Sequence, residues 1–125
     1  MNRLWFAFAF IALAVLLCTY EQYTVKTTFE NLETILGSMD TAAKNEDYKE
    51  VEKKCKQLED LWTAKYPHLS AVTEHSALRD AGVTIYSIRD LAKNKSDDLS
   101  PTIHQAQTEI KGIYDESKDT LGNIF

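Results

Sequence analysis

The residues best suited to chemistry in this chain are three histidines, His68, His75 and His104. An imidazole can act as a general base or bind a metal ion, but either role needs partner groups at a suitable spacing. His68 and His75 are seven residues apart, about 10 Å along one helix, too far to share an ion without a third element. No H-E-x-x-H, C-x-x-C, G-x-S-x-G or S-x-x-K pattern occurs. We therefore expect no catalytic, cofactor-binding or metal-binding residues and no enzymatic activity.

A second group of side chains is suited to binding. Trp62 and Tyr66 are one helical turn apart and can stack on a ligand or contact a partner, although we favour core packing for them. His75 falls at a position expected to face inward, with Arg79 one turn later. A hydrogen-bonded core histidine explains His75 more simply than a ligand or pH-sensing site does. The candidate contacts for a partner or ligand are thus Trp62, Tyr66, His75 and Arg79.

An apolar segment from Leu4 to Tyr20 contains no charged residue and lies between Arg3 and Glu21. At about 1.5 Å per residue, a helix of this length spans roughly 25 Å, the short end of a bilayer crossing. A cleaved signal peptide is the alternative, but no small-x-small pattern closes the segment. Leu17 before Cys18 also disfavours a lipoprotein signal. We therefore favour an uncleaved anchor that has the lipid bilayer as its partner.

The distribution of charge predicts an orientation for that anchor. Thirteen of the 14 basic residues and all 19 acidic residues follow Tyr20, which gives that part of the chain a net charge of −6. Because basic flanks stay inside, we expect a single-pass protein of the cell membrane with a cytoplasmic N-terminus and an extracytoplasmic body. The negative body would repel phosphate backbones, so nucleic acid is not an expected partner.

The elements that must position these side chains are helices. Apolar residues repeat at spacings of three and four over about 24–43, 47–66, 68–93 and 99–118. The first of these stripes follows the apolar segment without a break and consists of Val25, Phe29, Leu32, Leu36, Met39 and Ala43. We predict an all-α fold in which an N-terminal transmembrane helix continues into an antiparallel three- to four-helix bundle. Residues 1–23 would form the anchor and residues 24–125 the bundle.

Two local features set the expected boundaries. Pro67 should end or kink the second helix, because proline lacks the N–H that a helix needs and disfavours a helical residue before it. A corner and a kink remain alternatives. Leu69 and Val72 are assigned to the third helix. Ile124 and Phe125 are costly to leave in water, so we expect the C-terminus to dock on the bundle.

The order of several features resembles a bacterial family, domain of unknown function 4363, which is common in clostridia and related Firmicutes. The features, which extend over nearly the whole chain, are the N-terminal anchor, Glu46-Asp47-Tyr48, Leu58 and Trp62 before a helix break, the isolated His75, and Asn123-Ile124-Phe125. The resemblance implies a membrane-anchored helical domain, and a partner among multi-pass membrane proteins encoded nearby, but no activity. Acidic residues follow the histidine in the family, whereas Ser76 to Arg79 follow it here, which argues against a metal role for His75.

These features together favour a non-enzymatic accessory or scaffold subunit that binds a membrane or envelope protein. The alternative is an extracytoplasmic sensor, a helical bundle that binds a small ligand or a metal through Trp62, Tyr66 and His75. The stripe from Val25 to Ala43 can pack within the monomer or against a second copy. We favour the monomer, with a homodimer as the other option.

Overall fold

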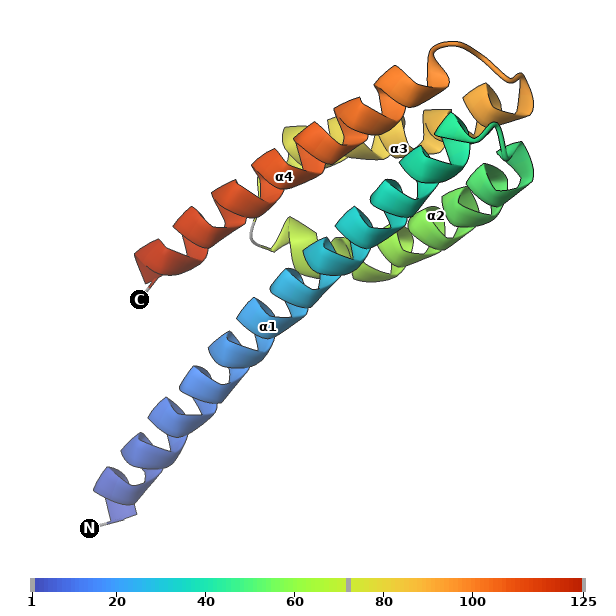
Figure 1. The fold of residues 1–125 in the computed structure, drawn as a ribbon. Coiled ribbons are helices and arrows are strands. Elements are labelled where there is room, and N and C mark those ends of the chain that lie inside the picture. The colour runs from blue at the N-terminus through green and yellow to red at the C-terminus, as the bar shows by residue number, and fades with distance from the viewer. Residues whose placement is uncertain (1, 72, 125) are drawn as a thin grey trace.

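The computed structural model describes residues 2–71 and 73–124, with side chains described as far as residue 119. Its helices are α1 (Asn2–Lys44), α2 (Tyr48–Ser70), α3 (His75–Lys93) and α4 (Leu99–Ile124). Both α1 and α3 pack against α2 and α4. With short connections, the helices alternate in direction around an antiparallel four-helix bundle, from which the first half of α1 extends alone (Figure 1). The predicted all-α bundle is confirmed.

The apolar stripes predicted from the spacing form the core of this bundle. In α1 the buried members are Val25, Phe29, Leu32, Leu36 and Met39. Ala42 is buried in place of the expected Ala43, which is half-buried. In α4 the buried members are Leu99, Ile103, Ala106, Ile110 and Ile113. Burial of each large side chain of this kind contributes about 1.5–3 kcal/mol, so these stripes determine which face of each helix points inward.

The N-terminal part of α1 extends away from the other helices (Figure 1). Every large apolar side chain from Leu4 to Leu17 is exposed. The stretch is long and apolar enough to cross a membrane, which makes it a candidate for a single span by length and composition. The helix then continues without a break into the buried residues that begin at Thr24. A rigid helix therefore connects the apolar stretch to the bundle.

Two tight turns close the end of the bundle that is remote from this stretch. Glu46, after α1, and Lys95, after α3, both have positive φ angles, of 57° and 50°. The next residues donate backbone N–H groups to the helices just ended, Asp47 to Ala42 and Ser96 to Leu91. Asp47 then caps α2 by accepting a hydrogen bond from the backbone N–H of Glu50 at 3.3 Å. These turns fix the connections between antiparallel neighbours.

Of the two alternatives for Pro67, an end of the second helix at this residue was wrong. α2 continues through Pro67 to Ser70, so Leu69 belongs to α2. Leu69 is fully buried, and that burial offsets part of the roughly 3 kcal/mol that proline costs inside a helix. Because Pro67 has no N–H, the carbonyl of Thr63 lacks its ordinary helical partner. The expectation for Val72 lies outside the described residues.

The inward position expected for His75 was also wrong. α3 begins at His75 itself, and the side chain is exposed. The first buried residue of α3 is Leu78, one turn further along. His75 therefore lies at the end of the bundle where α2 passes to α3, and none of the described side chains buries it. The expected docking of Ile124 and Phe125 concerns side chains outside the described ones.

Candidate functional site

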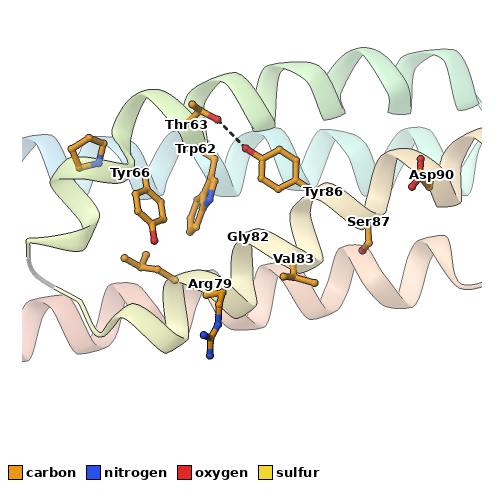
Figure 2. A pocket seen from close by; sticks show the side chains of 11 residues that line it. Trp62, Thr63, Tyr66, Arg79, Gly82, Val83, Tyr86, Ser87 and Asp90 are labelled. Carbon is orange, nitrogen blue, oxygen red and sulfur yellow. Dashed lines mark hydrogen bonds between the residues drawn. The ribbon is translucent and has the colours of Figure 1, made fainter.

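A groove runs along the boundary between α2 and α3 (Figure 2). Its volume is about 750 Å³ and its lining is mostly apolar. The side chains from α2 are Trp62, Thr63, Tyr66 and Pro67. Those from α3 are Leu78, Arg79, Gly82, Val83, Tyr86, Ser87 and Asp90. The groove is therefore formed by two antiparallel helices on the side of the bundle that faces away from α1 and α4.

The floor of the groove depends on a close approach between Trp62 and Gly82. Trp62 is 3% exposed, and its ring packs edge-on to Tyr66 with the centroids 6.2 Å apart. A Cβ atom added to Gly82 would lie 3.3 Å from Nε1 of Trp62. That distance is shorter than the optimum for nonbonded heavy atoms, so a larger residue at position 82 would displace the indole. Gly82 thus sets how deeply the tryptophan sits.

A hydrogen bond connects the two helices that form the groove. The hydroxyls of Thr63 and Tyr86 lie 2.9 Å apart and link α2 to α3, as Figure 2 shows. No described residue accepts a hydrogen bond from Nε1 of Trp62, and this atom is not among the fully buried unpaired ones. The indole N–H of Trp62 is therefore a donor without a partner among the described residues at the floor of the groove.

Two apolar side chains are exposed beside this floor. Val83 is 67% exposed and Tyr86 47% exposed. Among the described side chains beyond Tyr23, no other large apolar residue is exposed. An exposed apolar patch beside a buried aromatic floor is typical of a surface that binds a partner or ligand.

The charged side chains of the groove stand at its two ends. Arg79 lies toward the start of α3 and Asp90 near its end, so about 16 Å of helix separates them. Within the described part of the chain, neither side chain has an oppositely charged partner within 4 Å, whereas the neighbouring Arg89 pairs with the buried Glu59. In Figure 2 the guanidinium of Arg79 points away from Tyr66 and Trp62. A basic residue thus flanks the groove at one end and an acidic residue at the other.

Three of the four residues proposed from the sequence line this groove, namely Trp62, Tyr66 and Arg79. His75 does not line it. Sequence reasoning missed Val83 and Tyr86, although a signal was present. Arg79, Val83, Tyr86 and Asp90 repeat at spacings of four, three and four, which forms a second stripe on α3 beside the buried one.

The groove begins close to the end of the apolar stretch of α1. Glu21 directly follows the apolar segment. Its Oε1 atom lies 3.3 Å from Nδ1 of His68, which is near the end of α2. Pro67 and Trp62 precede His68 by one and six residues, which corresponds to at most about 9 Å along the helix. The end of the groove that holds Pro67 is therefore level with the point where α1 leaves its apolar stretch.

His104 belongs to a polar cluster that connects α1 to α4 at the end of the bundle remote from the apolar stretch. Nε2 of His104 lies 3.1 Å from Oδ1 of Asp40, and Nζ of Lys44 lies 3.2 Å from Oδ2. Burial would raise the pKa of Asp40, but hydrogen bonds from Lys44 and His104 and their positive charges together lower it below its ordinary value. This cluster ties α1 to α4.

A second polar cluster joins α2 to α3. Glu59, which is 9% exposed, pairs with Arg89 across the two helices. The neighbouring Cys55 is buried, and its burial, together with the negative charge of Glu59, raises the pKa of its thiol to about 12. The thiol therefore stays protonated and unreactive at neutral pH.

No three His, Cys, Asp or Glu side chains in the described ranges lie close enough together to bind a metal ion. Cys18 and Cys55 are both free. The two polar clusters described above thus act in contacts between helices, whereas the groove is open to another molecule.

The fold and the groove together define a class, a four-helix bundle whose first helix carries a candidate membrane span and whose α2–α3 face has an open apolar groove. Within that class, residues 19–124 match the family described as Domain of unknown function (DUF4363), and the chain belongs to this family. The match begins after most of the apolar stretch and includes the whole bundle. No curated protein and no solved structure matches the chain.

Proposed function

We propose that this chain is a non-enzymatic accessory subunit that is held in a membrane by the first part of α1 and binds a segment of a membrane protein in the α2–α3 groove. The observation that carries the proposal is the exposure of Val83 and Tyr86 beside the buried Trp62. Covering apolar side chains of this size contributes about 1.5–3 kcal/mol each, and aromatic residues commonly dominate such contacts. Two of the three histidines, which a catalyst could use, instead connect helices, His104 with Asp40 and His68 with Glu21.

Two observations support a partner in the same membrane. The apolar stretch has the length of a span and continues as one helix into the bundle. The groove begins level with the end of that stretch, because His68 contacts Glu21. With Arg3 before the stretch and a net charge of −6 after Tyr20, the positive-inside rule favours a cytoplasmic N-terminus and an outer bundle.

Site-specific photo-crosslinking in native membranes tests the partner. A photoreactive residue at Val83 or Tyr86 should form an adduct with one membrane protein in near-stoichiometric yield. Matched probes at Glu33 on α1 and Lys111 on α4, which are exposed but lie outside the groove, should not form it. Val83→Glu should abolish the adduct obtained from position 86. Because Val83 is exposed, this change should alter stability by no more than about 0.5 kcal/mol.

The control for Val83→Glu is Thr108→Glu, which introduces the same charge in place of another β-branched residue on the exposed face of α4. It should leave the adduct unchanged. Equal adduct yields from positions 83 and 111, or a chain that forms no adduct and purifies from detergent as an inert monomer, would contradict the proposal. Capture of a protein that is insensitive to Val83→Glu would not support it.

The rigid connection through α1 can be tested by insertions that rotate the bundle about the axis of α1 relative to the apolar stretch. Two alanines inserted between Thr19 and Tyr20 should rotate the bundle by about 200° relative to the span and raise it by about 3 Å. Four alanines should rotate it by only about 40° and raise it by about 6 Å. The adduct from position 83 should be lost with two residues and better retained with four. Equal yields from both variants would contradict a rigid placement of the groove.

A small ligand is the second candidate, favoured by the size and lining of the groove. A volume of about 750 Å³ is within the range of small-molecule sites, which combine apolar walls with few polar groups. Thermal unfolding of the full chain with metals and small apolar ligands tests this role, since a bound ligand raises the melting temperature. A Trp5→Phe variant leaves Trp62 as the only tryptophan, so its fluorescence should report an occupied groove.

A further inference from the structure

We infer that the occupant of the α2–α3 groove is an amphipathic helix of about three turns that runs parallel to α3, with an acidic first turn beside Arg79 and a basic last turn beside Asp90. This inference rests on the proposed function and specifies the partner segment. Three features of the groove support it, namely its length, the position of its charges and its end near the apolar stretch.

The length and lining of the groove fit a helix. Arg79 and Asp90 are eleven residues apart on α3, about 16 Å, which is three turns of a helix laid alongside. Between them, Val83 and Tyr86 are exposed and Trp62 forms the floor. Apolar residues at i, i+3 or i+4, and i+7 on one face of an incoming helix would cover these three side chains in succession.

The charges of the groove do not stabilise their own helix. Near a helix start an acidic residue is favourable and near its end a basic one, but α3 has Arg79 toward its start and Asp90 toward its end. Neither side chain has a salt-bridge partner among the described residues. A second helix with the ordinary charge pattern, acidic first and basic last, complements both positions when it runs parallel to α3. A helix in the opposite direction would need charges that oppose its own macrodipole.

The direction of α3 agrees with an approach from the membrane. α2 returns toward the apolar stretch, where His68 contacts Glu21, and α3 runs away from it again (Figure 1). A partner helix that leaves the same membrane beside α1 would therefore enter the groove at Arg79 and continue toward Asp90. Both the charge pattern and the entry point give the same polarity.

Two designed peptides test this polarity against the full chain in detergent micelles. Both peptides carry the same apolar face of Leu and Ile over 16 residues. One has two Glu in its first turn and two Lys in its last turn, and its twin has these charges exchanged. Fluorescence anisotropy should give a Kd about three- to tenfold lower for the first peptide, because each end contributes a modest charge interaction.

The two peptides also differ in how stable their helices are, so a variant of the chain with exchanged charges is needed to show that the preference comes from the groove. In the double variant Arg79→Asp with Asp90→Arg, the preference should invert, because the net charge of the chain is unchanged and only the groove ends differ. The matched control, Lys111→Asp with Asp115→Lys on the exposed face of α4, should keep the original preference. A photoreactive group at the acidic end of the first peptide should label residues around Arg79 and not those around Asp90.

Each outcome decides between the two levels of the proposal. The same preference in the native and exchanged chains, or no binding of either peptide, would overturn the inferred helix even if the adduct from Val83 remained and supported the proposed function. Inverted preference without any adduct to a membrane protein would support a helix-binding groove and contradict the proposed partner. Labelling around Asp90 by the acidic end would overturn the direction.

Discussion

The contact between Gly82 and Trp62 gives a prediction that can be worked out from the structure. Gly37, Gly82 and Gly112 lie inside helices, within the range whose side chains are described. A Cβ atom at Gly37 or Gly112 would meet nothing within 4 Å, whereas one at Gly82 would lie 3.3 Å from Nε1 of Trp62. A series of Gly→Ala variants therefore measures this one contact against two internal controls.

The magnitudes follow from helix propensity and packing. Alanine is favoured over glycine in a helix by about 0.8–1 kcal/mol, so Gly37→Ala and Gly112→Ala should each stabilise the bundle by about that amount. For a domain of roughly 100 residues this corresponds to a rise in melting temperature of about 4 °C. Gly82→Ala gains the same propensity but forces Trp62 to move, which costs about 1–3 kcal/mol in a packed site. We expect Gly82→Ala to be between neutral and about 2 kcal/mol destabilising.

The assay is thermal unfolding of the full chain in detergent micelles, followed by circular dichroism. Trp62→Phe removes the indole nitrogen, so Gly82→Ala in that background should recover at least about 1 kcal/mol relative to its effect in the native chain. If Gly82→Ala raised the melting temperature as much as Gly37→Ala does, or if the double mutant showed no coupling, the placement of Trp62 against Gly82 as the groove floor would be refuted.

Three further predictions concern stability and reactivity. In a Cys18→Ser variant, Cys55 should react with a maleimide at least about a hundredfold more slowly in the native chain than in urea, because it is buried and its pKa is raised to about 12; rapid native labelling would contradict this. Asp40→Asn should cost about 1 kcal/mol at pH 7. Because the folded pKa of Asp40 lies below its unfolded value, the carboxylate stabilises the fold above about pH 4 and loses this effect as the pH falls through the folded pKa. Melting temperatures of the native chain and the variant should therefore converge in acid, and a gap that persists would contradict the ion cluster. Glu46→Gly should increase the free energy of unfolding by about 0.5–1 kcal/mol and so raise the melting temperature, because Glu46 has a φ angle of 57° that costs less for glycine. A lower melting temperature than that of the native chain would show that the Glu46 side chain has another role.

The core was the part of the fold that the sequence predicted best. Helical spacing of apolar residues identified the buried faces of the first and last helices, from Val25 to Met39 and from Leu99 to Ile113. This succeeds because burial of large apolar side chains is the dominant favourable term and has the period of the helix. The continuation of the apolar stretch into α1 followed from the same pattern.

Helix boundaries were predicted less well, since they depend on contacts between distant residues. Pro67 carries a strong local signal to stop, but the chain stays helical to Ser70, with Leu69 fully buried. That shift moves the start of α3 to His75 and leaves its side chain exposed at the end of the bundle. A local preference of about 3 kcal/mol was thus outweighed by tertiary packing that the sequence does not display.

The candidate site was predicted in part because its two helices had to be paired first. Trp62 and Tyr66 were identified by their type, but the groove exists only because α3 places Gly82 against the indole. Val83 and Tyr86 lie beside the buried stripe of α3, where apolar residues carry no clear signal until the neighbouring face is known to be open. The depth of the groove therefore depends on a pairing of α2 with α3 that spacing alone does not specify.

The continuous α1 makes the position of the groove a consequence of helix geometry. Because one helix contains both the apolar stretch and the buried residues from Thr24 onward, the bundle cannot rotate freely relative to the span. His68 contacts Glu21, which fixes the end of α2 at the same level. If the stretch spans a membrane, the groove then lies within about 20 Å of the bilayer surface and faces one side of the span. A partner in the same membrane can reach it with a short helical extension, whereas a freely diffusing partner gains nothing from that position.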